Sequence, residues 1–352
     1  MTSAHSPWPL FCNDLDQAQQ WICDQLARTP TDRTLGHKAL SLGLTNEVRQ
    51  LLNQSNLNLQ DATQRQWRFR LARLDGDKNP YSELIPPEVK TFTDLQMGHS
   101  RRMGVPAVVS LLGGIGDHLE VISILLEWSR IEKHPLILQV TPQRQKNLAP
   151  LIEQIPQLEL QTKIHPRAVQ SMAMREWICR NYDSIRFDTW ITNRLDTKTA
   201  ERGNLYCWKA KGEGNLLSAY LRTVPFTLVF EYYKITKQLH PRLSLIDVSD
   251  WQSHEIELLQ RIGVQCLNPR YMGLKKLAKA CSSKQIITID TALAHLCAVM
   301  GKNAKLILNK IPDERWRELH QPQHCYGKHL TIFQQRQFCS WEETLSELIA
   351  SA

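Results

Sequence analysis

Two segments of the sequence combine flexible and polar residues in an order that suits the binding of an anion. The first is residues 113–119, Gly-Gly-Ile-Gly-Asp-His-Leu, which follow an apolar run and open a segment with helical periodicity. Backbone N–H groups at the start of a helix are unpaired and point outward, so they can bind a phosphate group. Asp117 adds a carboxylate that can accept a proton from a hydroxyl nucleophile. An aspartate at this place is equally suited to cap the helix, and the glycines to form a structural turn.

The second segment is a β-branched run that ends at Asp290 and continues into a helical pattern. Thr291 is expected to cap this helix, so that the amides of Ala292 and Leu293 point outward toward an anion. His295 follows on the first helical turn, where it can donate to a phosphate oxygen. A histidine in a helix is otherwise a core or surface residue, and both interpretations stay open.

The elements around these segments alternate between strands and helices. Residues 15–75 have helical periodicity, and 35–54 resemble one helix pair of a solenoid repeat. A linker containing Gly and Pro follows over 76–104. Apolar runs of strand length then alternate with helical patterns, which predicts parallel sheets. The expected strands are 105–112, 135–140, 158–162, 204–208, 242–248, 285–290 and, as the last one, 305–309.

This alternation predicts an α/β fold with two Rossmann-like lobes behind a short helical N-terminal region. The expected division is 1–100 for the helical region and linker, 101–202 for the first lobe and 203–352 for the second. Ligands in such sheets bind at the carboxyl ends of the strands, where both segments fall.

Composition narrows the class of protein. The formal charge of +8 favours anionic partners, namely nucleic acid, a membrane surface or a phosphorylated small molecule, and no nucleic-acid motif is present. No apolar run approaches the ~18 to 20 residues of a membrane span, and the start lacks the features of a signal peptide. The nine cysteines are odd in number and contain no CxxC pair or metal-site spacing. Together these features predict a cytoplasmic protein with reduced thiols.

Four stretches resemble glycosyltransferase family 9, the ADP-heptose–lipopolysaccharide heptosyltransferase family. Residues 290–298, Asp-Thr-Ala-Leu-Ala-His-Leu-Cys-Ala, resemble its D-[ST]-G-x-x-H-x-x-A motif, and 116–119, Gly-Asp-His-Leu, its G-D-x-L loop. Residues 207–209 and 222–225, Cys-Trp-Lys and Arg-Thr-Val-Pro, are similar to a strand-loop and an R-S-x-P pattern. The stretches similar to the tail of its tetratricopeptide-linked branch are 312–316, Tyr326, 330–334 and Trp341. The resemblance covers about residues 105–352.

The resemblance implies a GT-B fold and inverting transfer of a sugar from a nucleotide-sugar donor to an acceptor hydroxyl, without a metal or other cofactor. It implies that Asp117 is the general base. The acceptor is then a glycan, lipid or protein beside a loop that includes Gly114, Gly116 and His118. The residues implied to bind the donor diphosphate and to offset the charge of the leaving nucleotide are Asp290, Thr291, Ala292, Leu293, His295, Lys209 and Lys211. A departing diphosphate needs positive groups already aimed at it, which helix amides and lysines supply.

The sequence also departs from the family pattern. Ala292 replaces the motif glycine, residues 120–123 lack a proline common in the family, and fewer than 100 residues separate Val105 from Gly203. These departures favour the alternative of a non-catalytic, glycosyltransferase-like binding protein. An oxidoreductase is a third hypothesis. The pattern G-x-G-x-x-G read from Gly114 places Leu119 at the third glycine, and no acidic residue ends a strand ~20 residues later.

Overall fold

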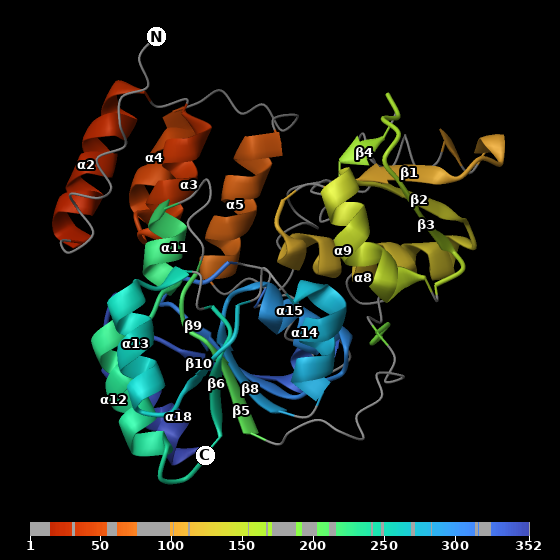
Figure 1. The fold of residues 1–352 in the computed structure, drawn as a ribbon. Helices are drawn as coiled ribbons and strands as arrows, with labels where there is room; N and C mark the ends of the chain where they lie inside the picture. Colours follow the sequence, from red (N-terminus) through yellow and green to blue (C-terminus); the bar gives the residue numbers. More distant parts are fainter. Residues whose placement is uncertain are drawn as a thin grey trace.

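The computed structural model describes residues 15–29, 32–54, 62–75, 99–100, 102–111, 113–153, 155–166, 168–170, 188–191, 203–210, 216–240, 242–247, 250–268, 272–282, 284–313, 316 and 325–351. These residues form two parallel sheets and a set of N-terminal helices (Figure 1). The predicted α/β class, with two Rossmann-like lobes behind a helical region, is confirmed.

The smaller sheet has four parallel strands in the order β3-β2-β1-β4. Its strands are β1 (Ala107–Ser110), β2 (Leu136–Gln139), β3 (Leu158–Gln161) and β4 (Val169–Gln170). Two helices connect them, α8 (Ile115–Glu132) and α9 (Pro142–Ile152). The sequence predicts a helix over 168–182, but Val169 and Gln170 pair with β1, so the start of that prediction is wrong. Residues 171–182 of it lie outside the described residues.

The larger sheet has six parallel strands in the order β10-β9-β8-β5-β6-β7. They are β5 (Gly203–Cys207), β6 (Leu243–Leu245), β7 (Gln265–Cys266), β8 (Lys284–Ile289), β9 (Ala304–Leu308) and β10 (Leu330–Gln334). The helices of this lobe are α11 (Leu216–Arg222), α12 (Phe226–Thr236), α13 (Ser253–Arg261), α14 (Gly273–Ser282), α15 (Ala292–Val299), α17 (Cys325–His329) and α18 (Glu342–Ala350). The prediction that 305–309 is the last strand is wrong, because β10 follows and pairs with β9.

The order of this sheet is that of a doubly wound fold. Numbered along the chain from β5, the strands run 3-2-1-4-5-6 across the sheet. The chain therefore winds in one direction from β5 to β7 and in the other from β8 to β10. Strands β5 and β8 are neighbours at the point of reversal, and doubly wound folds bind their ligands at the carboxyl ends of the strands at such a point.

Both faces of the larger sheet are covered by helices, as expected for a parallel sheet. Along β5, Leu205 belongs to the core on the side of α14 and α15, and Tyr206 to the core on the side of α12, α13 and α18 (Figure 1). The first core continues into the smaller lobe, because α8 packs against α15 and α9 against α14. The two lobes thus share one hydrophobic core.

The N-terminal helices are α2 (Leu15–Arg28), α3 (Arg33–Ser41), α4 (Thr45–Gln54) and α5 (Ala62–Leu74). Asp32 caps α3 by accepting the amides of Thr34 and Leu35. The four helices enclose a separate core that also takes in two leucines of α11, which lies beside them (Figure 1). Within the described part of the chain, no helix is long and apolar enough to cross a membrane.

Candidate anion-binding site

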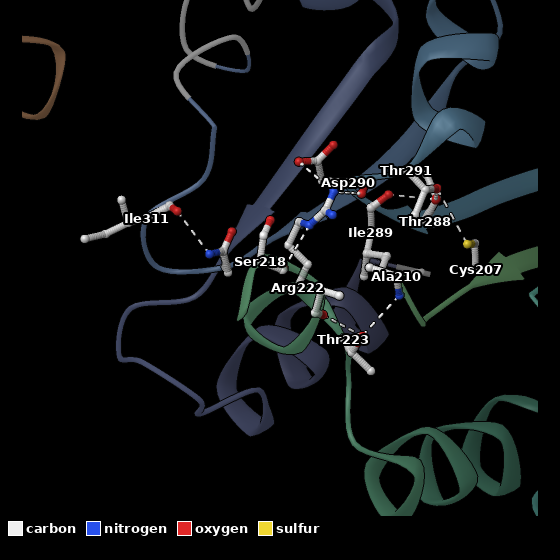
Figure 2. A network of polar contacts seen from close by, with 12 residues as sticks. Cys207, Ala210, Ser218, Arg222, Thr223, Thr288, Ile289, Asp290, Thr291 and Ile311 are labelled. Atoms are coloured by element: carbon white, nitrogen blue, oxygen red, sulfur yellow. Dashed lines mark hydrogen bonds and ion pairs between the residues drawn. The ribbon is translucent and has the colours of Figure 1, made fainter. Parts of the chain in front are cut away.

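The second sequence segment lies at the reversal point of the larger sheet. Strand β5 ends at Cys207, which pairs with Thr288 near the end of β8. The Cys207 sulfur lies 3.6 Å from the hydroxyl of Thr291, so the loop after β5 and the start of α15 are side by side (Figure 2). The residues expected to bind a diphosphate therefore begin where doubly wound folds bind their ligands.

The start of α15 carries backbone amides that Thr291 does not cap. Thr291 is at the N-cap position with extended backbone, but its side chain makes no bond to the helix amides. Its hydroxyl instead lies 3.2 Å from that of Thr288. Thr291 therefore occupies the N-cap position as predicted, but its side chain does not make the predicted hydrogen bond to the helix. The amides of Ala292 and Leu293 have no partner within their own helix, and they carry its positive partial charge.

Asp290 is paired with an arginine from α11. The Asp290 carboxylate lies 3.4 Å from the guanidinium of Arg222, and the same guanidinium nitrogen donates to the Asp290 carbonyl at 2.7 Å (Figure 2). The side chain of Asp290 is largely buried. Arg222 offsets the negative charge of Asp290. The paired carboxylate therefore repels an anion at the start of α15 less than an unpaired carboxylate would.

The two sequence segments meet at His295. A Cβ atom added at Gly116 would lie 2.6 Å from the His295 ring and 3.4 Å from the Ala292 Cα, so the first turns of α8 and α15 are in direct contact. His295 is only 2% exposed. Its Nδ1 lies 3.1 Å from the Tyr326 hydroxyl, and its ring centroid lies 4.8 Å from that of Trp316. The ring is therefore held in an aromatic cluster with one edge toward Gly116.

Asp117 closes the first turn of α8. Its carboxylate accepts the amide of Gly114 at 2.8 Å, which is the reciprocal half of a capping box. Gly113 has φ +93, and a Cβ there would lie 2.6 Å from the same carboxylate oxygen, so the turn requires glycine at this position. Asp117 remains partly exposed. Asp117 therefore caps helix α8. The sequence left this role open beside that of a general base.

His118 is buried, and neither ring nitrogen has a hydrogen-bond partner within the described residues. Burial lowers the pKa of His118 to about 4, and the nearby Arg144 lowers it further while Asp117 acts in the opposite sense. The imidazole is therefore neutral at pH 7 and adds no positive charge to the site.

The loop after β5 carries Lys209, whose ammonium lies 4.8 Å from the centroid of the Trp251 ring. The amides of Trp208 and Lys209 both donate to the buried carboxylate of Asp247. Burial raises the pKa of Asp247 to about 6, and the nearby Trp251 indole together with the hydrogen bonds from the two amides partly offsets the rise. Lys211, the other lysine expected here, lies outside the described residues.

Sequence reasoning assigned no role to Arg222 or Asp247. A signal for each was present, because Arg222 opens the quoted Arg-Thr-Val-Pro stretch and Asp247 follows the apolar strand next to β5. The groups that Arg222 and Asp247 contact depend on the order of the strands in the sheet. Local periodicity of the sequence carries no information on that order.

Comparison with known proteins gives likenesses of fold alone. No protein-family model matches the chain, and no curated protein matches its sequence. The E. coli heptosyltransferase WaaC with ADP is 12% identical, with a TM-score of 0.46 over 70% of this chain and 100% of that one. WaaC with ADP-2-deoxy-2-fluoro heptose is 12% identical, with a TM-score of 0.45 over 70% and 99%. A glycosyltransferase family 9 protein from Veillonella parvula is 11% identical, with a TM-score of 0.39 over 65% and 86%.

Proposed function

We propose that the chain is a glycosyltransferase that moves a sugar from a nucleotide-sugar donor to an acceptor hydroxyl. The observation that carries the proposal is the meeting of the two sequence segments, since Gly116 of α8 touches His295 and Ala292 of α15 beside the reversal point of the larger sheet. A nucleophile on the smaller lobe and a leaving group on the larger one would both lie near this contact.

The donor diphosphate is proposed to bind at the start of α15. The amides of Thr291, Ala292 and Leu293 would face its oxygens, and the pairing of Asp290 with Arg222 reduces the repulsion that a bare carboxylate would add. Lys209, and Lys211 by the sequence resemblance, would balance the charge that grows on the departing nucleotide. His295 would contact the diphosphate only through the ring edge that faces Gly116, because its Nδ1 lies beside the Tyr326 hydroxyl.

Asp117 is proposed to act as the general base. The acceptor oxygen would attack the anomeric carbon from the face opposite the diphosphate, and the bond from that carbon to the diphosphate oxygen would break with its electron pair on the diphosphate. The acceptor proton would pass to the Asp117 carboxylate, and the anomeric configuration would be inverted. Gly114, Gly116 and the neutral His118 would shape the acceptor side.

The division into a helical region and linker (1–100), an acceptor lobe (101–202) and a donor lobe (203–352) is part of this proposal. The α3–α4 pair suits a tetratricopeptide-linked branch of the glycosyltransferases, and a cytoplasmic location suits a nucleotide-sugar donor. Both remain predictions from the sequence.

The first test is binding, measured as ligand-induced stabilisation with UDP, ADP, GDP, CDP, their sugar conjugates and NAD(P). A ligand at a hundredfold excess over its Kd stabilises the fold by about 2.7 kcal/mol. Ala292→Gly should bind the same nucleoside diphosphate more tightly, because it restores the glycine of the family motif and removes a methyl group from the start of α15. Ala298→Gly introduces glycine at the other end of α15 and should leave the affinity unchanged. If no nucleotide stabilises either the native chain or Ala292→Gly, the donor site is wrong.

The second test is turnover. Asp117→Asn keeps an oxygen that can accept the Gly114 amide, so α8 stays capped, but an amide cannot take up the acceptor proton. We expect nucleotide affinity within a few-fold of native and loss of sugar transfer. Transfer at the native rate by Asp117→Asn would exclude Asp117 as the base.

A non-catalytic binding protein is the second candidate, and one observation favours it. Gly116 of α8 lies directly against His295 and Ala292 of α15, where an acceptor would have to enter in the proposed mechanism. This candidate predicts nucleotide binding without sugar transfer to any acceptor or to water. Release of free nucleoside diphosphate from a nucleotide sugar, abolished by Asp117→Asn, would favour the enzyme.

A further inference from the structure

Helix α11 joins the N-terminal helices to the larger lobe. Leu217 and Leu221, both 5% exposed, belong to the core that α2–α5 enclose. They pack there with residues such as Ile22 and Leu40, which are fully buried. The apolar side of α11 is therefore part of the N-terminal core, although α11 follows β5 in the chain and lies beside the larger sheet (Figure 1).

The last residue of α11 reaches the candidate site. The Nε of Arg222 donates to the Ser218 carbonyl of its own helix at 3.0 Å, which fixes the guanidinium at the end of α11. Nη1 donates to the Asp290 carbonyl at 2.7 Å and faces the Asp290 carboxylate at 3.4 Å. Figure 2 shows this guanidinium between α11 and the end of β8. Because Thr291 and α15 follow directly, Arg222 sets where the uncapped amides begin.

The other half of the site is tied to the same helix end. The Thr223 hydroxyl donates to the Ala219 carbonyl of α11 at 2.8 Å and accepts the Ala210 amide at 3.1 Å. The Val224 amide donates to the Trp208 carbonyl at 2.9 Å. The loop that carries Lys209 is thus held from both sides by residues at or just after the end of α11. Both proposed diphosphate-binding segments depend on where α11 lies.

A second contact fixes the N-terminal helices to the larger lobe. Gly43, in the turn between α3 and α4, has φ +80, and a Cβ there would lie 3.2 Å from Ile311 and 3.5 Å from Phe338. The Ile311 carbonyl accepts from Asn309 directly after β9. With contacts at α11 and at this turn, a shift of the N-terminal helices is transmitted to the larger lobe.

We propose that the N-terminal helices set the geometry of the diphosphate site through α11, with Arg222 as the positioning residue. A molecule that shifts α2–α5 would change the affinity at α15, and a diphosphate at α15 would in turn steady α11 and the N-terminal helices, because coupling between two sites is reciprocal. The proposal rests on the proposed function only for the identity of the ligand, since the mechanical link is a property of the unliganded chain.

The test of the link is hydrogen–deuterium exchange of the full-length, unliganded protein. Leu221→Ala removes packing between α11 and the N-terminal core, and we expect exchange over residues 286–299 to become at least tenfold faster. Leu158→Ala on β3 is the matched control, because Leu158 is also buried but lies in the outermost strand of the smaller sheet, away from residues 286–299. In the control variant, exchange over residues 286–299 should change less than threefold. Equal acceleration of 286–299 in both variants would overturn the proposal.

Arg222 is tested without disturbing the apolar core. Arg222→Gln should speed exchange over 286–299 at least fivefold and leave α2–α5 within twofold. Arg222→Lys should restore most of the protection, because an ammonium can still donate to the Asp290 carbonyl. A residue needed only for its bulk would show no such rescue, and equal exchange in the Gln and Lys variants would overturn the role of Arg222.

The final arm uses inorganic pyrophosphate as the probe. Binding to the native protein should slow exchange in α11 and α3, and Arg222→Gln should weaken binding about tenfold. Pyrophosphate binding without protection of α11 would contradict the coupling. If the native chain binds no pyrophosphate, the proposed donor site fails, whereas the exchange results of the unliganded variants still decide the link.

Discussion

Replacing Gly116 with alanine tests whether the first turns of α8 and α15 touch in solution. An alanine Cβ would lie 2.6 Å from the Cδ2 of His295 and 3.1 Å from its Nε2. Contacts this short force side chains or backbone to move, and overpacking of this kind costs about 1–3 kcal/mol. Alanine also favours a helix over glycine by roughly 0.5–1 kcal/mol. We therefore expect a net loss of about 1–2 kcal/mol in the free energy of unfolding.

The loss depends on the His295 ring being unable to move away. The ring is held by Tyr326 at its Nδ1 and lies against Trp316, both of which are almost fully buried. If the two lobes were apart at this point, the alanine would meet no ring. Gly116→Ala would then stabilise the protein through helix propensity alone, so the sign of the effect reports on the contact.

The assay is a double-mutant cycle followed by urea unfolding. In a His295→Ala background the ring is gone, and Gly116→Ala should stabilise by roughly 0.5–1 kcal/mol. The coupling energy between the two positions should then be about 2 kcal/mol, in the range found for residues in contact. Gly114→Ala is the control, because its Cβ meets nothing closer than 3.5 Å. Additive effects of Gly116→Ala and His295→Ala would refute the contact.

Three further predictions concern buried groups. Burial raises the pKa of Asp247 to about 6 from its ordinary 3.8, so its stabilising contribution is present below pH 4 and lost as pH rises to 6. Because of Asp247, the free energy of unfolding should fall by about 3 kcal/mol between pH 4 and pH 6, and Asp247→Asn should remove that fall in urea unfolding experiments. The same pH dependence in the variant as in the native protein would contradict the assignment. His118 has its pKa lowered to about 4, so stability falls as pH drops from 6.5 to 4, and His118→Leu should abolish up to about 3 kcal/mol of that fall. Gly36→Ala places a methyl group 2.1 Å from the Trp67 ring and should destabilise the N-terminal helices by about 2–3 kcal/mol, and a stable variant would argue against their packing.

The elements that sequence reasoning found are those with a long apolar signal. Strand β8 is buried on both faces over nearly its whole length, so its β-branched run predicts a central parallel strand. Strands β4 and β7 have two residues each, which is too short for any period to show. Helix α11 has seven residues, and its Leu217 and Leu221 pack on helices far away in the chain. Such elements exist because of tertiary contacts, and local patterns do not reveal them.

The candidate site divides in the same way. Asp117, His295 and the start of α15 could be singled out because each lies at a strand-to-helix turn. The sequence could not show that Arg222 pairs with Asp290, since 68 positions separate them and the pairing depends on the packing of α11. It also left open whether Asp117 caps its helix, which only the bond to the Gly114 amide shows.

The core shared by the two lobes limits how this chain can be recombined with others. Leu119 of α8, Leu148 of α9, Leu277 of α14 and Leu296 of α15 all belong to it. A chimera that exchanged one lobe at the boundary between the sheets would therefore cut through packed side chains instead of a solvated linker. To stay folded, such a chimera would have to bring along the matching faces of all four helices. Exchanging a lobe of this chain is thus a problem of core design.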